Sequence, residues 1–367
     1  MKRASNQMSI VLPDLRGGGA ERVSVDLAHE FARAGHTVEF VLMQARGELL
    51  EEAREHFSVV DLATPRARAL PRALAHYLRR QRPDALLAAM WPLTVIAPLA
   101  ARLSGHRCKV LVSEHNSLSV QYRDWGWSHR VALWASMAVG YRLVDHRVGV
   151  SSGVANDIAR LSGLRRDAFD VIHNPVPPRP EPSRQAIRDA EALWSGSKGA
   201  RIITVGSMKA QKNHPLLLRS FARLDRPKAR LMFVGDGAGR DAILALAQDL
   251  GVADRVIVAG FHPDPTPFYQ TADLFVLSSD YEGFGNVIVE ALACGIPVVS
   301  TDCPSGPSEI LDGGRFGWLV PVGDVGALAE AMHTALDAPA DRDALRHRAT
   351  HFAPEIAARR YLDHLDL

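Results

Sequence analysis

Two glutamates frame a glycine-rich turn in the second half of the chain. Glu282 and Glu290 stand on either side of the segment GFGNVIV, which follows an apolar stretch that ends at Ser278-Ser279. Carboxylates accept hydrogen bonds from sugar hydroxyls, and both acids come to about the same helix face if Glu282 immediately precedes the helix. Because ligands of parallel sheets bind at the carboxyl ends of strands, the pair indicates a sugar-binding site. The alternative is a solvated helix face.

A second glycine cluster, GGG at 17–19, follows the first apolar run and precedes an amphipathic segment. Backbone N–H groups at such a helix start attract phosphate, although an ordinary turn has the same composition. A dinucleotide fingerprint would need another glycine where Arg22 stands. The cluster GDGAG at 235–239 departs in the same way, with Arg240 in that position. Both loops therefore argue against a nicotinamide-dependent dehydrogenase.

Short apolar runs rich in β-branched residues alternate with longer helical patterns along the whole chain, which is typical of parallel sheets covered by helices. Residues 174–182 contain five prolines and admit neither a helix nor a central strand, so they divide the chain. The predicted fold class is α/β, with two doubly wound domains over 1–173 and 174–353, and a C-terminal helix over 354–367 that packs back on the first domain. Strands are expected at 8–12, 37–43, 85–90, 108–113, 146–151, 201–206, 230–235, 255–260, 273–278 and 296–300.

The charge is nearly balanced over the chain but unevenly distributed within it. There are 43 Lys and Arg against 41 Asp and Glu, whereas residues 1–175 alone carry 23 basic and 17 acidic side chains. The basic first half favours an anionic partner, while the overall balance argues against a nucleic-acid coat protein. Three cysteines without a CxxC pair fit a reducing compartment, and the polar residues after Met1-Lys2-Arg3 do not resemble a signal peptide. We therefore expect a cytoplasmic protein.

The segment from Ser278 to Pro321, which includes YEGFGNVIVEALACGIPVV and CPSGPSEIL, closely resembles the nucleotide-sugar-binding region of the retaining glycosyltransferases of family GT4. Further resemblances follow in chain order over nearly the whole sequence: the glycine loop GGGAE at 17–21, the strand-end motif SEHN at 113–116, the interdomain entry VIHNPV at 171–176 and the phosphate-binding segment VGSMKAQKNH at 205–214. The resemblance implies a GT-B-like fold of two Rossmann-like domains with a cleft between them.

The resemblance also implies a role for each matching residue. Glu290 would hold the ribose hydroxyls, Glu282 would lie near the donor sugar, and Lys212 would neutralise the diphosphate. His115 would face the sugar from the first domain, whose glycine loop at 18–19 would approach the diphosphate. The predicted catalytic residues are His115, Lys212 and Glu282, and the predicted donor-binding residues are Gly18, Gly19, Ser207, Lys212, Gly283, Phe284, Gly285, Asn286 and Glu290.

Some of these residues are also compatible with purely structural roles, although the flanking motifs favour a site role for His115 and Lys212. His115 fits a packed core histidine, and Lys209 and Lys212 fit ordinary loop cations. Many relatives carry arginine directly after the glycine of the phosphate-binding segment, where this chain has Ser207, so Lys212 or Lys209 would have to replace a bidentate phosphate contact. The DxD-like triplet at 341–343 lies in a charged helical pattern and is expected to be a solvated face, so no metal site is predicted.

Two segments of the first half suit an anionic membrane surface. Residues 65–83 carry six arginines and no acid, with Leu70, Leu74 and Leu78 at helical spacing. Residues 125–142 mix three tryptophans with apolar residues and arginines. For both, the alternative is a surface helix whose apolar side packs on its own sheet.

The sequence therefore predicts a metal-independent, retaining glycosyltransferase that needs no cofactor. It would move a hexose or N-acetylhexosamine from a nucleotide-diphosphate sugar, UDP in preference to GDP, to a lipid-linked or polysaccharide acceptor. The resemblance to bacterial surface-polysaccharide and glycan-lipid transferases supports UDP, and we expect a peripheral position on the inner face of the cell membrane and no nucleic-acid partner. The alternatives are a nucleotide-sugar epimerase or hydrolase on the same fold, and a non-catalytic nucleotide-sugar-binding partner of another transferase.

Overall fold

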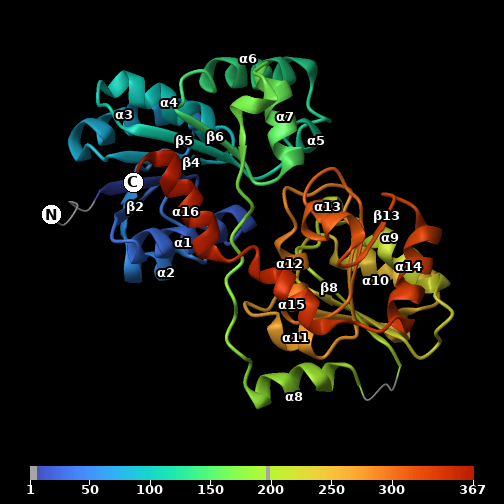
Figure 1. Cartoon of the computed structure of the whole chain (residues 1–367). Helices are drawn as coiled ribbons and strands as arrows, with labels where there is room; N and C mark the ends of the chain where they lie inside the picture. Colours follow the sequence, from blue (N-terminus) through green and yellow to red (C-terminus); the bar gives the residue numbers. More distant parts are fainter. Residues whose placement is uncertain (1–5, 196–198) are drawn as a thin grey trace. The chain divides into compact units, whose positions relative to one another are not determined.

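The chain forms two parallel β-sheets, each covered by helices (Figure 1). The computed structural model describes residues 6–195 and 199–367. Unit 1 comprises Met1–Pro177 and Ala353–Leu367, and unit 2 comprises Pro178–Phe352. The division falls inside the proline-rich segment, four residues later than the one expected from the sequence.

Within the described residues, unit 1 has a seven-stranded sheet in the order β3-β2-β1-β4-β5-β6-β7, with all neighbours parallel. Its strands are β1 (Gln7–Leu12), β2 (Thr37–Leu42), β3 (Ser58–Asp61), β4 (Ala85–Ala89), β5 (Lys109–Glu114), β6 (His146–Gly149) and β7 (Asp170–Val171). Its helices are α1 (Gly19–Arg33), α2 (Leu50–His56), α3 (Leu70–Gln81), α4 (Leu93–Ser104), α5 (Leu118–Gln121), α6 (Trp127–Gly140), α7 (Ser152–Ser162) and α16 (Pro354–Leu365).

The described part of unit 2 has a six-stranded parallel sheet in the order β10-β9-β8-β11-β12-β13. Its strands are β8 (Arg201–Val205), β9 (Arg230–Val234), β10 (Val256–Gly260), β11 (Leu274–Leu277), β12 (Val298–Thr301) and β13 (Trp318–Val320). Its helices are α8 (Arg184–Leu193), α9 (His214–Arg223), α10 (Arg240–Asp249), α11 (Thr266–Gln270), α12 (Asn286–Ala293), α13 (Pro307–Ile310), α14 (Val325–Asp337) and α15 (Arg342–Thr350).

Each sheet has a point where the strand order reverses. In unit 1 the chain runs outward from β1 to β3 and then crosses to β4, and in unit 2 it runs from β8 to β10 and then crosses to β11. Loops on the two sides of such a point diverge and leave a crevice at the carboxyl ends of the strands, where α/β proteins bind ligands. In unit 2 this crevice lies next to the loops after β8 and β11.

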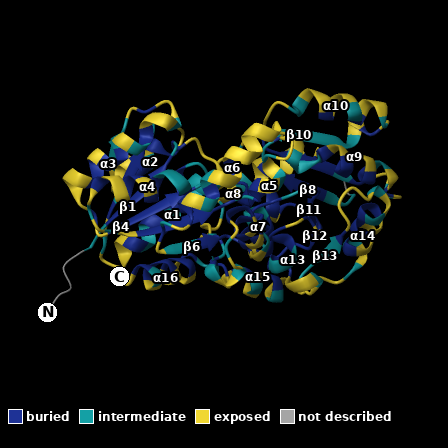
Figure 2. Cartoon of the chain, turned by 90° about the horizontal axis from the view of Figure 1, so that it is seen from above, coloured by how far each residue is buried: buried dark blue, intermediate teal, exposed yellow. Residues whose placement is uncertain are grey.

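The central strands are continuous apolar runs because both faces of each sheet are covered. In β1 every residue from Met8 to Leu12 is buried, and the central strands are dark blue in Figure 2. The apolar stretch that begins at Ala85 divides into β4, a loop at Trp91-Pro92 and the helix α4, which contains Pro98. Three short strands were not expected from the sequence, namely β3, β7 and β13. They lie at the sheet edges, where partial exposure weakens the apolar pattern.

The last helix belongs to the core of unit 1. Figure 1 shows α16, in red, beside α1, in blue, and Tyr361 is buried in the cluster that also contains Phe31. Tyr361 Oη lies 2.9 Å from Ser113 Oγ on β5. The final segment of the chain therefore completes the first sheet's packing.

Helix α3 carries the arginine-rich pattern noted in the sequence, and its apolar stripe is fully used within unit 1. Leu70, Leu74 and Leu78 are all buried in the cluster that α3 shares with α4. The side chains of α3 that remain exposed are polar, and three of them are arginines. For α3, therefore, the apolar stripe is a packing stripe.

Candidate active site

The reversal point of unit 2 brings Lys212 and Glu282 together. Lys212 lies in the loop after β8, and Glu282 lies in the loop after β11, the neighbouring strand. The Lys212 Nζ donates a hydrogen bond of 2.6 Å to Glu282 Oε1, which also accepts one of 2.6 Å from Ser279 Oγ. The two charged side chains are 16% and 9% exposed. A lysine and a glutamate separated by 70 residues thus form a nearly buried ion pair at the expected ligand crevice.

Further hydrogen bonds fix these two loops against each other. Asn213 Nδ2 donates to Asp280 Oδ1 at 2.7 Å, and Gln211 Nε2 donates to the carbonyl of Tyr281 at 2.9 Å. Ser278 Oγ donates to the carbonyl of Lys212 at 2.8 Å. Because the backbone on both sides is held, the ammonium and the carboxylate need little reorganisation to receive a ligand.

An ammonium carries three donor protons, and the ion pair accounts for one of them. The Lys212 Cε would lie 3.4 Å from a methyl group placed on Gly206, so the lysine stem runs along the glycine that follows β8. Ser207 follows and is half-buried, and its carbonyl accepts the Lys209 N–H at 2.8 Å. The Lys209 side chain is exposed. Of the two lysines, the structure therefore places Lys212 at the carboxylate and Lys209 on the surface.

The glycine turn opens α12 as the sequence predicts. Gly285 precedes the helix with φ of 99°, a conformation that glycine adopts at little cost. Phe284 is buried, and its carbonyl oxygen would lie only 1.8 Å from a methyl group on Gly306, whose own φ is 90°. Gly283 and Asn286 flank this turn. The backbone N–H groups of the first helical turn begin at Asn286, where the helix dipole favours an anion.

Glu290 lies on α12, and its partners differ from those of Glu282. Its Oε2 accepts a hydrogen bond of 3.1 Å from Tyr269 Oη, and its Oε1 lies 3.8 Å from an Arg179 guanidinium nitrogen. Burial raises the pKa of Glu290, and the positive charge of Arg179 opposes this. The two predicted carboxylates therefore have separate partners: Glu282 pairs with a lysine, whereas Glu290 accepts a hydrogen bond from a tyrosine and lies near an arginine.

Arg179 and Tyr269 were not singled out from the sequence. Arg179 lies in the proline-rich segment, where a single arginine among prolines reads as a solvated linker residue. Tyr269 lies on the five-residue helix α11, which is too short for a helical pattern. Only the residue types could have indicated these two partners, because Arg179 is 111 residues and Tyr269 is 21 residues away from Glu290 in the sequence.

In unit 1, Gly18 and Gly19 begin α1 directly after the loop that follows β1. Gly18 is the N-cap with extended backbone and no side-chain hydrogen bond to the cap, and a methyl group on Gly19 would meet nothing within 4 Å. The Glu21 carboxylate lies against Gly18, where a methyl group on that glycine would clash with it, so an acidic side chain stands at this helix start. A phosphate that bound the first N–H groups of α1 would have to displace this carboxylate.

His115 follows β5 and is buried, and its Nδ1 has no hydrogen-bond partner among the described residues. Burial lowers the pKa of His115 to about 4, so the imidazole is neutral at neutral pH. A neutral imidazole can accept or donate one hydrogen bond at each nitrogen but cannot serve as a cation. An unpaired buried ring nitrogen favours a ligand-binding role over simple packing.

The residue before His115 is a buried carboxylate that was not predicted to have a role. Glu114 accepts hydrogen bonds from Thr94 Oγ1 at 2.5 Å, from Tyr141 Oη at 2.9 Å and from the Trp91 N–H at 3.2 Å. Burial raises its pKa from 4.5 to about 7, against the opposing effect of these hydrogen bonds. Glu114 thus fixes the end of β5, from which His115 projects.

The DxD-like triplet stabilises its own helix. Asp341 caps α15 by accepting the Ala344 N–H at 3.0 Å, and Asp343 accepts from Arg346 at 3.1 Å. Within the described residues, no group of three His, Cys, Asp or Glu side chains has a metal-binding arrangement. Independence from metal ions stays a prediction.

Family models match both halves of the chain. The model described as Glycosyltransferase Family 4 matches residues 17–179, and the model described as Glycosyl transferases group 1 matches residues 188–352. The lipopolysaccharide core biosynthesis glycosyltransferase LpsE of Rhizobium meliloti is 31% identical over 323 residues, which cover 86% of this chain and 85% of the relative. The N-acetylgalactosamine-N,N'-diacetylbacillosaminyl-diphospho-undecaprenol 4-alpha-N-acetylgalactosaminyltransferase of Campylobacter jejuni is 29% identical over 251 residues, 68% of this chain and 67% of the relative.

The fold is shared with solved structures at low identity. Anabaena HepE, solved in complex with UDP, has a TM-score of 0.85 at 20% identity over 98% of this chain and 99% of that one. The lipopolysaccharide outer core galactosyltransferase WaaB has a TM-score of 0.76 at 19% identity, with 98% and 99% covered. Two parallel-sheet α/β domains of this kind define the GT-B fold. The chain belongs to glycosyltransferase family 4, which confirms the resemblance and the fold class inferred from its sequence.

Proposed function

We propose that this glycosyltransferase moves a hexose or N-acetylhexosamine from a UDP-sugar to a lipid-linked glycan acceptor, with retention of anomeric configuration and without a metal ion. The observation that carries the proposal is the Lys212–Glu282 pair at the reversal point of unit 2, beside the glycine turn that opens α12. The name of the Campylobacter relative includes a diphospho-undecaprenol acceptor, the Rhizobium relative is named for lipopolysaccharide core biosynthesis, and HepE was solved with UDP. These names support the donor and the class of acceptor.

In this proposal the groups of unit 2 stabilise the departing nucleotide diphosphate. The Lys212 ammonium keeps its hydrogen bond to Glu282 and donates a second one to a phosphate oxygen. The first N–H groups of α12 and the helix dipole add partial positive charge. Cationic groups aimed at the leaving phosphate act most strongly as its charge develops, so they accelerate cleavage of the sugar–oxygen bond. Glu282 also limits the net charge of the site when the donor is absent.

Glu290 would receive the ribose hydroxyls. Its Oε1 is 3.8 Å from Arg179, a distance beyond a direct hydrogen bond, so this oxygen retains acceptor capacity. His115 would bind a hydroxyl of the transferred sugar through its unpaired Nδ1. Each of these assignments follows the family pattern and the side chain's own hydrogen-bonding capacity.

Incubating the purified protein with a panel of UDP- and GDP-sugars and a membrane lipid extract tests the proposal. We expect mass spectrometry to detect a glycosylated lipid formed from one UDP-sugar. NMR should show that the product has the same anomeric configuration as the donor. Transfer should continue in the presence of a metal chelator. No sugar transfer from any donor by folded protein would contradict it. Free sugar or an isomer formed without acceptor would indicate the hydrolase or epimerase, and tight donor binding with no turnover, unchanged by Glu282→Ala, would indicate a non-catalytic partner.

A further inference from the structure

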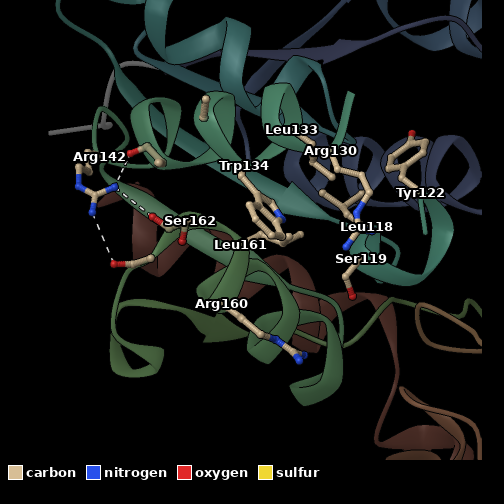
Figure 3. A pocket seen from close by; sticks show the side chains of 13 residues that line it. Leu118, Ser119, Tyr122, Arg130, Leu133, Trp134, Arg142, Arg160, Leu161 and Ser162 are labelled. Atoms are coloured by element: carbon tan, nitrogen blue, oxygen red, sulfur yellow. Dashed lines mark hydrogen bonds between the residues drawn. The ribbon is translucent and has the colours of Figure 1, made fainter. Parts of the chain in front are cut away.

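A pocket of about 740 Å³ opens in unit 1 between α5, α6 and the end of α7 (Figure 3). Sites for small organic ligands usually measure about 300–1,000 Å³. Its apolar lining includes Leu118, Leu133, Trp134 and Leu161, and no acidic residue lines it. The volume and the lining therefore suit an apolar ligand or part of one.

Helix α6, which forms one wall, has two apolar stripes. Leu133, Met137 and Gly140 are buried against the rest of unit 1 at i, i+4 and i+7 spacing. Trp127 and Trp134, also seven residues apart, lie on a different face and are 80% and 49% exposed. Most of the helix is exposed (Figure 2), so the second stripe is only partly covered within the described residues. A surface helix that is apolar beyond its packing stripe indicates an additional apolar contact.

The charged side chains that line the pocket are all arginines, and one of them, Arg160, lies 3.7 Å from the Asp157 carboxylate. Three arginines line the pocket, and α6 itself contains no Asp or Glu. Arg142 is held by the carbonyls of Ser162 and Gly163 at 3.0 and 3.5 Å, on one side of Trp134 in Figure 3. Arg130 lies on the other side, over the Trp134 ring at 6.0 Å from its centroid. It is exposed and makes no ion pair within the described residues, so its guanidinium can meet an anion.

The combination separates α6 from α3, the other segment that the sequence indicated. On α3 the leucines are buried and the exposed side chains are polar, whereas α6 and its pocket present exposed tryptophans, a cavity and an arginine without an ion pair together. Tryptophan at a surface beside arginine is typical of a membrane interface, because the indole prefers the headgroup region and the guanidinium pairs with phosphate. None of the described helices combines the length and the apolar content of a membrane span.

We propose that the exposed face of α6 docks on a bilayer that contains anionic phospholipid, and that one acyl chain of such a lipid enters the α5–α6–α7 pocket while Arg130 contacts its phosphate. The inference rests on the proposed function in one respect: a lipid-linked acceptor brings the enzyme to a membrane. The occupant is a lipid because the pocket is apolar and its charged rim is entirely basic, as a phosphate headgroup attached to an alkyl chain requires.

Vesicle sedimentation with the full-length protein tests the docking. We expect binding to vesicles of equal parts phosphatidylcholine and phosphatidylglycerol, and binding weaker by about tenfold or more to pure phosphatidylcholine. The double substitution Trp127→Ser and Trp134→Ser removes the interfacial indoles and is expected to weaken binding by about tenfold. The matched control is Leu99→Ser with Leu103→Ser, which removes two α4 side chains that are 42% and 50% exposed and leaves binding unchanged.

Charge and pocket have their own variants. Arg130→Glu is expected to weaken binding to the anionic vesicles by about tenfold, whereas Arg102→Glu, an exposed arginine of α4, changes it by less than about twofold. Ala138→Phe fills the pocket. Phosphatidylglycerol brominated on its acyl chains quenches tryptophan fluorescence on contact. The difference in quenching between the wild type and Trp134→Phe gives the part that is due to Trp134. This part is expected to fall in Ala138→Phe, because the acyl chain no longer enters beside Trp134.

Three outcomes would overturn the inference. They are absence of binding to the anionic vesicles, binding that the α6 and α4 double variants lower equally, and a dimer in solution that the α6 variant dissociates, which would make this face a contact between two copies. Circular dichroism and UDP binding by calorimetry confirm that each variant is folded. Vesicle binding without sugar transfer would leave this inference standing while contradicting the proposed function, and transfer without vesicle binding would do the reverse.

Discussion

The Lys212 ammonium is placed to serve two negative groups in turn. In the structure it neutralises Glu282 in a site where the carboxylate is 9% exposed. A buried ion pair of this kind adds little net stability, but removal of one partner leaves an uncompensated charge and costs about 3–5 kcal/mol. The pair is therefore better explained by what the ammonium does when a diphosphate arrives than by the stability of the fold.

Substitution of Lys212 separates these two roles. We expect Lys212→Gln to lower kcat/KM for sugar transfer by about 10²–10³-fold, the usual cost of one preorganised charge-stabilising donor, and to lower thermal stability as well. The double variant Lys212→Gln with Glu282→Gln should recover stability, since no charge is left buried, without recovering activity. Lys228→Gln, at an exposed position of unit 2, is the matched control. Recovery of activity in the double variant would show that Lys212 only balances Glu282.

Glu114 and His115 are neighbours whose ionisation affects folding in opposite directions. Burial raises the pKa of Glu114 from 4.5 to about 7, so between these pH values the folded chain holds a proton that the unfolded chain has lost. Its contribution to stability is full below about pH 4.5 and is lost as the pH rises through 7. Lowering the pKa of His115 from 6.5 to about 4 has the reverse effect, because its contribution is full above about pH 6.5 and is lost as the pH falls through 4. Each corresponds to about 3 kcal/mol, so the two largely cancel in the wild type.

Single substitutions should expose the two dependences. Relative to the wild type, Glu114→Gln should gain about 3 kcal/mol of unfolding free energy as the pH rises from 4.5 to 7, since it removes a loss in that range. His115→Gln should show the opposite slope, becoming relatively less stable as the pH rises from 4 to 6.5. Urea unfolding at a series of pH values measures both. A variant whose unfolding free energy changes with pH in parallel with that of the wild type would contradict the burial of the ionisable group that it replaces.

The residues found from the sequence are those whose partners are nearby in the chain or whose motif is continuous. The turn around Gly285 and the two glutamates were predicted because one short segment carries them all. The pairing of Glu290 with Arg179 and the burial of Glu114 by Thr94 and Tyr141 depend on tertiary contacts. No local spacing encodes such contacts, so the sequence could not predict them.

At the scale of elements, the position of the glycine turn depends on a second glycine behind it. Gly306 has φ of 90°, and a methyl group on it would lie 1.8 Å from the carbonyl oxygen of Phe284. The loop before α13 thus supports the start of α12 by backbone contact alone. The N-terminus of α12 is held at the crevice by packing that only glycine permits.

A matched pair of glycine substitutions tests this support. Gly306→Ala and Gly313→Ala both place a methyl group at a positive φ, but Gly313 has nothing within 4 Å of that methyl position. We expect about 1–2 kcal/mol of destabilisation from backbone strain at Gly313 and more than that at Gly306, where strain and the clash add. UDP affinity, measured by calorimetry, should fall only for Gly306→Ala. Equal UDP affinities would show that this contact does not position the turn.

Element types were predicted more reliably than edges. The central strands follow strong apolar patterns, so β1 agrees with its expected range of 8–12 to within one residue. The edge strands β3, β7 and β13 contain two to four residues each and are partly exposed, and their positions are set by the neighbouring strand. The leucines of α3 and the tryptophans of α6 gave similar patterns, and only packing distinguishes the buried stripe from the exposed one.

At the scale of the whole molecule, the chain leaves unit 1 at Pro177 and returns to it at Ala353. Unit 1 is therefore completed by residues that are translated after all of unit 2. Ala357, Ala358, Tyr361, Leu362 and Leu365 of α16 are all buried in its core. Burial of one large apolar side chain contributes about 1.5–3 kcal/mol, so this helix supplies an amount comparable with the total stability of a domain.

The return helix makes a sharp prediction about which unit a mutation in α16 destabilises. Tyr361→Ala should lower the stability of unit 1 by about 3–5 kcal/mol, because it leaves a cavity beside Phe31 and removes the partner of Ser113 Oγ, while unit 2 keeps its own unfolding transition. Ile356→Ala, on the same helix but 45% exposed, is the control and should change stability by less than about 1 kcal/mol. Hydrogen exchange measured by mass spectrometry resolves the two units: protection should fall in β1, β4 and β5 and persist in β8 and β11. Loss of protection spread equally over both sheets would show that the two units unfold as one.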